Sequence, residues 1–129
     1  MNRKLFLLCL LGLLSVSSAY AKCEGGKEVT NSVGTTFCCS NVSLNWWSAA
    51  AWCKANGLHL ATMYEMCPSW DGTTGGGKCP EFNGIGTGFV WSSTANGASS
   101  AFSVYDSGSG YVNYHNNPGR SAAYYALCK

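Results

Sequence analysis

Cysteine is the residue type that most constrains how this chain can fold. Eight cysteines occur among 129 residues, and none forms a Cys-x-x-Cys pair. That spacing disfavours a zinc site, where short cysteine steps usually supply two ligands. Small exported domains instead use disulfides to compensate for a modest core. We therefore expect a disulfide-linked domain without a metal. The cysteines stand at positions 9, 23, 38, 39, 53, 67, 79 and 128.

The first 21 residues have the features of an export signal. Arg3 and Lys4 give a positive start, residues 5–14 form a largely apolar run, and residues 19–21 read Ala-Tyr-Ala. This small-x-small pattern suits signal peptidase. Ten residues span about 15 Å of helix, which is too short for a bilayer core of ~30 Å. We expect cleavage after residue 21, no remaining membrane span, and a secreted, periplasmic or cell-surface domain at residues 22–129.

Cleavage changes two counts on which later inferences depend. Loss of Arg3 and Lys4 leaves six basic against six acidic residues, so the net charge falls from +2 to zero. A neutral domain lacks the basic surface that nucleic acids require, and we expect no nucleic-acid partner. Loss of Cys9 leaves seven cysteines. Because seven is odd, one thiol stays unpaired or joins another chain.

One helix of three turns is predicted at residues 44–56. Apolar residues recur at i, i+3, i+4 and i+7 from Trp46 to Cys53, which is the spacing of one helical face. Ser43 is a suitable N-cap, and Gly57 suits the left-handed position that ends a helix. We expect this helix to bury both Trp46 and Cys53.

The rest of the chain predicts short strands around a long loop. Residues 22–34 are polar and glycine-rich and predict an irregular N-terminal arm or a loose hairpin, followed by a first strand at residues 35–39. A capping box at residues 62–65 predicts a second short helix. Glycine and proline exclude regular structure from residues 68–88. Further strands are expected at residues 89–91, 101–105, 111–115 and 124–128.

Two cysteine arrangements follow from this plan. Cys67 and Cys79 flank the long loop, and a bond between them would stabilise the domain by about 3 kcal/mol in the chain-entropy model. Cys38 and Cys39 are adjacent, so on a strand their side chains point to opposite faces. The working assignment pairs Cys23 with Cys38 and leaves Cys39 free, and the spacing equally allows the reverse. The free thiol is either buried as a small apolar group or exposed and able to join a second copy.

The motif W-x-x-A-x-x-x-C-x-x-x-G-L-x-L-A at residues 46–61 resembles the first helix and following strand of C-type lectin-like domains. Residues 89–94 are similar to the central tryptophan strand of that family, and residues 126–128 to its closing strand. The resemblance covers roughly residues 35–128. It implies a single α+β domain, in which two short helices pack on a small, mostly antiparallel sheet with a long, disulfide-closed loop.

The same resemblance implies a disulfide and argues against a metal. In the family the last cysteine pairs with the cysteine of the first helix, which corresponds to Cys53–Cys128. Calcium-dependent members carry Glu-Pro-Asn or Gln-Pro-Asp in the loop and Trp-Asn-Asp before the last strand, and neither occurs here. Residues 81–83 and 116–119 are the nearest fragments, and they lack the oxygen ligands that Ca²⁺ requires. We expect no metal and no cofactor.

Polar and aromatic residues near the end of the chain form the first candidate for ligand contact. Flat rings beside amides suit the recognition of a sugar or a peptide, although an ordinary strand ending in an asparagine-rich turn has the same composition. On a strand, alternate residues of this cluster share one face. The cluster consists of Tyr111, Asn113, Tyr114, His115 and Asn116.

Trp70 is the second candidate, because an exposed tryptophan at a loop tip can anchor a ligand. A ring folded back over the loop is the alternative. Catalysis is not expected: His59 is placed as a structural histidine, and His115 has no nucleophile that spacing identifies.

The expected function is therefore a secreted, non-catalytic domain that binds a carbohydrate or protein ligand without calcium. The alternative is a structural subunit of a surface appendage or envelope assembly, joined through the unpaired cysteine or a strand edge. A small hydrolase is a third and less favoured reading.

Overall fold

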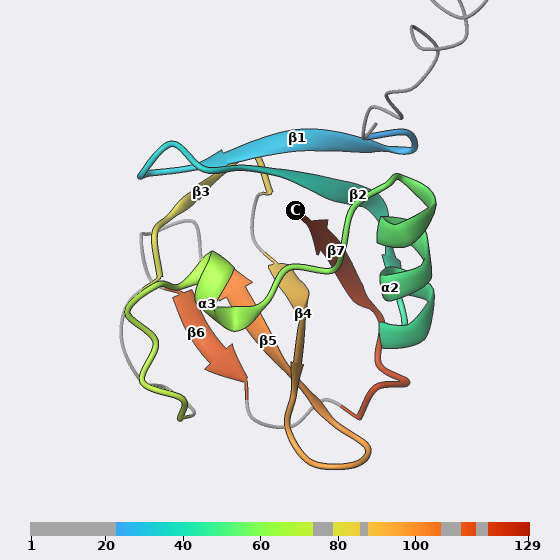
Figure 1. The fold of residues 1–129 in the computed structure, drawn as a ribbon, viewed down its shortest axis with the longest axis vertical. Helices are drawn as coiled ribbons and strands as arrows, with labels where there is room; N and C mark the ends of the chain where they lie inside the picture. Colours follow the sequence, from blue (N-terminus) through green and yellow to red (C-terminus); the bar gives the residue numbers. More distant parts are fainter. Residues whose placement is uncertain (1–22, 74–78, 86–87, 107–111, 116–118) are drawn as a thin grey trace, which may run out of the picture.

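The computed structural model describes residues 23–73, 79–85, 88–106, 112–115 and 119–129, without the side chains of residues 106 and 112–115. Helices and strands alternate irregularly along this chain (Figure 1). In order, they are β1 (Gly26–Asn31), β2 (Thr36–Leu44), α2 (Trp46–Ala55), α3 (Met63–Met66), β3 (Phe82–Asn83), β4 (Gly88–Ala95), β5 (Ala101–Asp106), β6 (Val112–His115) and β7 (Tyr124–Cys128).

The strands of the described ranges form one sheet in the order β3-β1-β2-β7-β4-β5-β6. Neighbouring strands run antiparallel, with the exception of the parallel pair β4 and β7. Figure 1 shows β1 and β2 crossing above the other strands, with α2 beside β7 and α3 in front of β5 and β6. This arrangement confirms an α+β fold with two short helices on a mostly antiparallel sheet.

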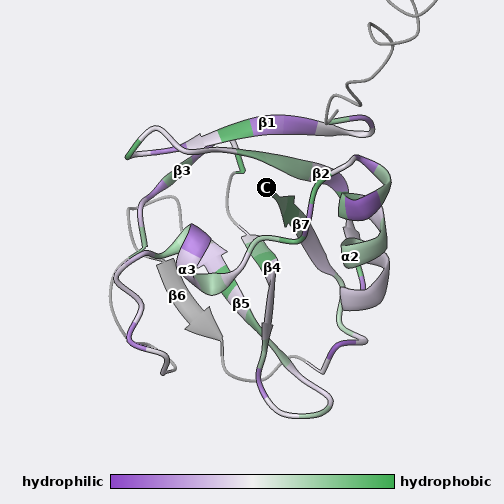
Figure 2. Cartoon of the chain, in the orientation of Figure 1, coloured by the Kyte–Doolittle hydropathy of each residue, from purple (hydrophilic) through white to green (hydrophobic). Residues whose placement is uncertain are grey.

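Alternate residues of the central strands pack on opposite faces of the sheet. Val90 and Leu127 belong to the apolar cluster that includes α3 and the loop after it. Trp91 and Ala126 belong to the cluster beneath α2. Strand β7 is almost continuously apolar, as expected for a strand covered on both sides, whereas β4 carries a polar Ser-Ser-Thr run near its end. Figure 2 shows green in parts of β2, β7 and β5.

The N-terminal segment is more ordered than an irregular arm. Residues 26–31 form β1, so of the two forms expected for residues 22–34 the structure adopts a hairpin, with Glu28 opposite Cys38. A Cβ on Gly26 would clash with the carbonyl oxygen of Cys39 and stand 2.8 Å from the Trp52 ring. Glycine at this position therefore lets β1 pack closely between β2 and the helix.

Helix α2 begins two residues later than predicted. Its N-cap is Asn45, whose side chain accepts a hydrogen bond from the Ser48 N–H at 2.8 Å, and not Ser43. Ser43 belongs to β2, where it lies opposite Tyr125 of β7. Strand pairing therefore prevails over the local capping preference. Gly57 follows the helix with φ +73°, as its predicted role requires.

The second predicted helix is confirmed as α3. The Thr62 hydroxyl accepts from the Glu65 N–H at 3.1 Å, and the Glu65 carboxylate accepts from the Thr62 N–H at 2.9 Å. These two bonds form the expected capping box. Met63 and Met66 are buried, so this single turn seals one end of the core.

The long loop contains one element that composition did not predict. Residues 82–83 form β3 and pair with Thr30 and Asn31 of β1. A partner strand elsewhere in the chain supplies these hydrogen bonds, which glycine-rich sequence alone does not suggest. The predicted strands after the loop correspond to β4, β5, β6 and β7.

Three disulfides match the expected pairs: Cys23–Cys38, Cys53–Cys128 and Cys67–Cys79. The second joins α2 to the last strand, and the third closes the long loop. Cys39 is unpaired and buried. Across the described residues, no helix has the length and apolar character needed to cross a membrane.

Candidate functional site

The predicted polar and aromatic cluster lies at β6, the last strand of the sheet. Tyr111 and Asn116 fall outside the described residues, and for Asn113, Tyr114 and His115 only the backbone is described. The register places these three positions opposite Tyr105, Val104 and Ser103 of β5, respectively.

Four aromatic rings stack along the side of the sheet that carries α2, next to β6. The ring centroids are 4.7 Å apart for Trp91 and Tyr124, 4.9 Å for Tyr124 and Phe89, and 4.6 Å for Phe89 and Tyr105. Trp91 is fully buried and the other three are partly buried. Phe89 and Tyr124 are stacked at 24°, and the other two pairs are tilted by 40° and 42°. Because the rings pack on one another and are partly or fully buried, this aromatic stack offers limited ring surface to a sugar.

Trp70 is not an exposed anchor. Its side chain is 6% exposed and makes edge-on contacts with Phe102 at 4.9 Å and Tyr64 at 5.1 Å. Its indole N–H donates to the carbonyl oxygen of Thr73 at 2.7 Å. The ring is folded back over the loop and forms part of the core, so the prediction that Trp70 contacts a ligand is wrong.

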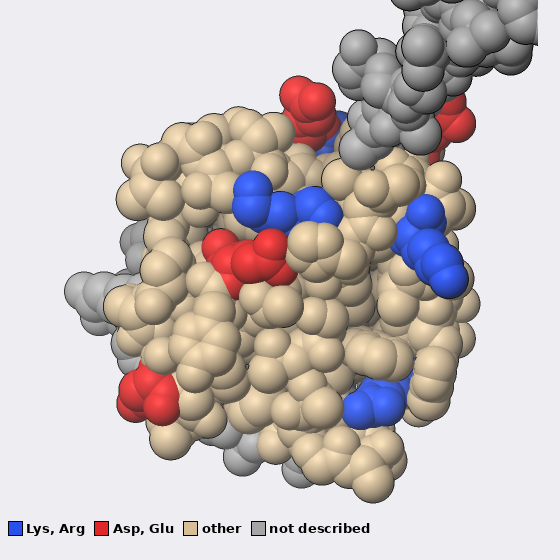
Figure 3. All heavy atoms as spheres, in the orientation of Figure 1, with Lys and Arg blue, Asp and Glu red and all other residues tan. Residues whose placement is uncertain are grey.

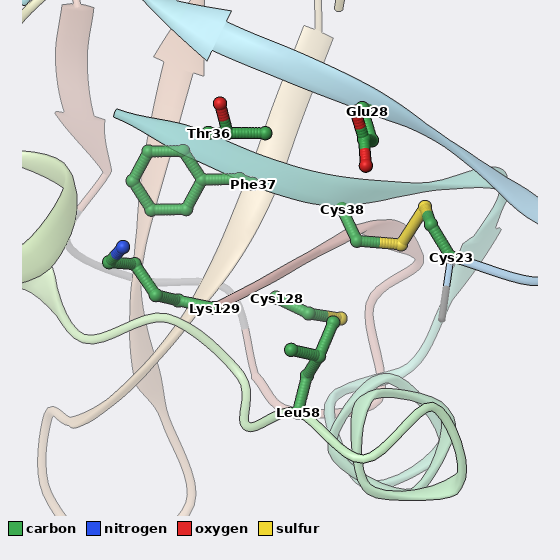
Figure 4. Close-up of a pocket in the computed structure, with 8 residues that line it drawn as sticks. All are labelled: Cys23, Glu28, Thr36, Phe37, Cys38, Leu58, Cys128 and Lys129. Carbon is green, nitrogen blue, oxygen red and sulfur yellow. A yellow bond between two sulfur atoms is a disulfide. The ribbon is translucent and has the colours of Figure 1, made fainter. Parts of the chain in front are cut away.

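A pocket of about 290 Å³ lies where the N-terminal hairpin meets the end of β7 (Figure 4). Its walls come from four parts of the chain: the segment before β1, the β1–β2 hairpin, the residues after α2, and the end of β7. We call this hollow the disulfide pocket. It is lined by Cys23, Glu28, Thr36, Phe37, Cys38, Leu58, Cys128 and Lys129.

Strand register explains how these residues meet. Cys38 of β2 lies opposite Glu28 on one side and opposite Cys128 on the other, so the three stand in a row across β1, β2 and β7. Thr36 is two residues from Cys38 and therefore projects to the same face. Figure 4 shows Leu58 beside Cys128 at the opposite wall.

Two disulfides hold the walls of this pocket together. Cys23–Cys38 ties the start of the domain to β2, and Cys53–Cys128 ties α2 to β7; each pair has a Cα–Cα distance of 5.5 Å. Each disulfide fixes one side of the pocket, and the pairing of β2 with β7 holds the two sides together. A pocket fixed in this way is preorganised, which reduces the entropy lost when a ligand binds.

Charges of both signs stand at the pocket. Glu28 and Lys129 are exposed, and neither forms a salt bridge with another residue in the described part of the chain. Figure 4 shows them on opposite sides of Cys38 and Cys128. The Lys129 ammonium lies 5.6 Å from the centre of the Phe37 ring. Charged groups are otherwise sparse on the face in Figure 3, where the two signs are interspersed.

Cys39 lies on the other face of β2, in a small hollow of about 90 Å³ shared with Lys27 and Tyr125. The side chain is 2% exposed. Burial raises the pKa of this thiol to about 11, although the positive charge of Lys27 acts in the opposite direction. The thiol is therefore neutral at physiological pH and shielded from other chains. The predicted self-association through Cys39 is contradicted, and the buried alternative describes it correctly.

His59 and Glu65 form an ion pair that the sequence did not bring together. The His59 Nε2 atom lies 2.8 Å from the Glu65 carboxylate, and the His59 side chain is 59% exposed. Burial raises the pKa of Glu65, but hydrogen bonds from the Thr62 N–H and His59 outweigh this and lower the pKa overall. The same carboxylate accepts from the Thr62 N–H in the capping box, so the pair links residue 59 to the start of α3, and we assign it a structural role.

Within the described ranges, no three His, Cys, Asp or Glu side chains are placed to hold a metal ion, and the expectation of a metal-free domain stays a prediction. Comparisons with protein-family models, with curated proteins and with solved structures returned no match to this chain. The assignment of function therefore depends on the geometry alone.

Sequence reasoning missed the disulfide pocket because its lining residues come from segments as far apart in the chain as Cys23 and Lys129. The one available signal was the set of cysteines itself, since two predicted bonds involve Cys38 and Cys128. Only the register of β2 against β7 shows that these two cysteines are neighbours.

Proposed function

We propose that residues 22–129 form an exported, non-catalytic recognition domain with a C-type lectin-like fold that binds its ligand without calcium. The observation that carries this proposal is the disulfide pocket, a preorganised hollow with apolar walls and a few polar groups at its edge. Such pockets are typical of ligand sites. The three cysteines that line the pocket are in disulfides, so none of its described lining residues offers a free thiol.

The fold assignment is supported by the order of the elements. A first helix, an extended segment, a long disulfide-closed loop and a closing strand follow one another as in C-type lectin-like domains. The bond between Cys53 and Cys128 joins the first helix to that closing strand. Trp91 lies fully buried on β4, where the family has its central tryptophan strand.

A binding survey tests the proposal. The mature domain, with its disulfides intact, is screened against peptide and glycan arrays with and without a chelator. We expect hits that persist in the chelator and disappear in Thr36→Trp, whose indole fills the pocket from an exposed strand position. Val42→Trp, at an exposed position of the same strand away from the pocket, is the matched control. Binding that requires calcium, or that survives Thr36→Trp, would contradict the proposal.

A structural subunit of an envelope or surface assembly is the second candidate, and the edge of β1 favours it. Strand β3 covers β1 only at Thr30 and Asn31, so within the described residues the edge from Gly26 to Val29 has no paired strand. An open edge can accept a strand from a neighbour. Size-exclusion chromatography of the disulfide-intact domain over a range of protein concentrations tests this candidate, and a strictly monomeric domain at every concentration would count against it.

A further inference from the structure

We infer that the disulfide pocket binds a small zwitterion, namely a short peptide with unblocked ends, whose two charges are separated by at least one peptide unit. The ligand ammonium lies at Glu28 and its carboxylate at Lys129. This inference rests on the proposed function and decides the class of ligand for that site.

The charges determine the ends of the ligand. Glu28 comes from β1 and Lys129 follows β7, and Figure 4 shows the two on opposite sides of the pocket with Cys38 and Cys128 between them. Neither has a salt-bridge partner among the described residues. A ligand with a positive and a negative end can therefore satisfy both charges at once, whereas a neutral or singly charged ligand leaves at least one unmatched.

The pocket walls determine the middle of the ligand. Besides the two charged residues, the lining includes the Leu58 side chain and the disulfide-bonded residues Cys23, Cys38 and Cys128. These surfaces are apolar and held in place covalently, so they favour an aliphatic side chain over a hydroxyl-rich one. The Thr36 hydroxyl at the edge can form a hydrogen bond with a peptide group.

Size and aromatic content argue against a sugar. The volume of about 290 Å³ lies at the lower limit of ordinary ligand pockets, roughly 300 Å³, and favours a ligand of dipeptide size over an oligosaccharide. The aromatic residue of the lining is Phe37, which is 2% exposed and offers no open ring face. Sugar recognition usually relies on an accessible ring, and the half-buried aromatic stack lies elsewhere, on β7, β4 and β5.

Calorimetry with end-blocked ligands tests the inference. The probes are the dipeptide alanyl-leucine, its N-acetyl form, its C-terminal amide, and free leucine. Blocking either end is expected to weaken binding about fivefold, because each block removes one partly exposed charge pair. Free leucine carries both charges on one carbon, cannot reach Glu28 and Lys129 together, and should therefore bind more weakly than the dipeptide.

Variants of Glu28 and Lys129, combined with the blocked ligands, show which residue binds which end of the ligand. In Glu28→Gln the N-acetyl and free dipeptides should bind equally, and in Lys129→Gln the amide and acid should bind equally. The exchange Glu28→Lys with Lys129→Glu should recover binding relative to either reversal alone. Lys54→Gln, on the exposed surface of α2, is the control for general charge effects and should change nothing.

The outcomes distinguish this inference from the proposed function. Equal affinity for blocked and free dipeptides, or no response to Glu28→Gln and Lys129→Gln, overturns the zwitterion assignment. So does the absence of any binding by these probes. If Thr36→Trp still abolishes the binding of neutral ligands found on the arrays, the pocket is a recognition site and only the zwitterion assignment fails. If Thr36→Trp affects no ligand at all, both fail.

Discussion

The disulfide pocket and the aromatic stack lie on the same sheet but are stabilised in different ways. The pocket is bounded by segments far apart in the chain and held by two covalent bonds, and it leaves Glu28 and Lys129 in solvent. The stack consists of rings from β4, β5 and β7 that bury one another. The sequence suggested aromatic residues as ligand contacts, yet in the structure the aromatic stack stabilises the sheet. The space for a ligand lies instead in the disulfide pocket, between cross-linked segments.

The largest expected effect comes from removing a disulfide that supports the pocket but not the aromatic stack. Replacing Cys53 and Cys128 by alanine opens a loop of sequence separation 75 and should lower the free energy of unfolding by about 4 kcal/mol. Ligand binding in the pocket should be lost as well. Urea unfolding without reductant, under conditions in which the remaining disulfides do not exchange, measures the loss of stability. Calorimetry measures the loss of binding.

The matched control replaces Cys67 and Cys79 by alanine. Their disulfide closes a loop of sequence separation 12 that lies away from the pocket. This variant should lose about 3 kcal/mol and keep its ligand affinity. If both double variants lost binding equally, covalent support of the pocket walls would not be what distinguishes them.

The second prediction addresses the stack. Tyr124→Ala removes the ring between Trp91 and Phe89 and should cost about 2 kcal/mol, because its contacts on both sides are lost. Ligand affinity should change less than twofold in the folded protein. A large loss of binding with little loss of stability would show that the stack is a ligand surface, contrary to our assignment.

A third and smaller effect concerns the unpaired thiol. Cys39→Ala leaves a small cavity beside Tyr125 and should cost about 1 kcal/mol, with no change in oligomeric state. In the native protein, iodoacetamide should fail to label Cys39, whereas labelling in urea should be complete. Rapid labelling of the folded protein would contradict the burial on which this expectation rests.

The smallest effect depends on pH. The folded-state pKa of Glu65 is below its ordinary value of 4.5, so its ion pair and capping hydrogen bonds stabilise the fold above that pH. This contribution, about 0.5 kcal/mol for a partly exposed pair, is lost as the pH falls from 4.5 through the folded-state pKa. Glu65→Gln keeps a capping amide and should remove this part of the pH dependence, as thermal unfolding between pH 6 and pH 3 will show.

Local patterns predicted the elements that depend on neighbouring residues. The capping box at Thr62, the glycine after α2 and the strand-favouring runs of β4, β5 and β7 are short-range features, and each appears as expected. The errors occur where a distant partner intervenes. Ser43 joins β2 because β7 pairs with it, and Phe82 joins β3 because β1 does. Trp70 turns inward because Phe102 provides a partner.

By itself, the sequence determined that the domain would be cross-linked, neutral after cleavage at the predicted site, and of mixed helix and strand. Composition, cysteine spacing and short-range periodicity carry that information. Only the tertiary structure decided that Cys38 and Cys128 stand side by side, that Cys39 is hidden, and that Glu28 and Lys129 share one hollow. Strand register sets these relations, and register depends on how remote segments bury their apolar faces together.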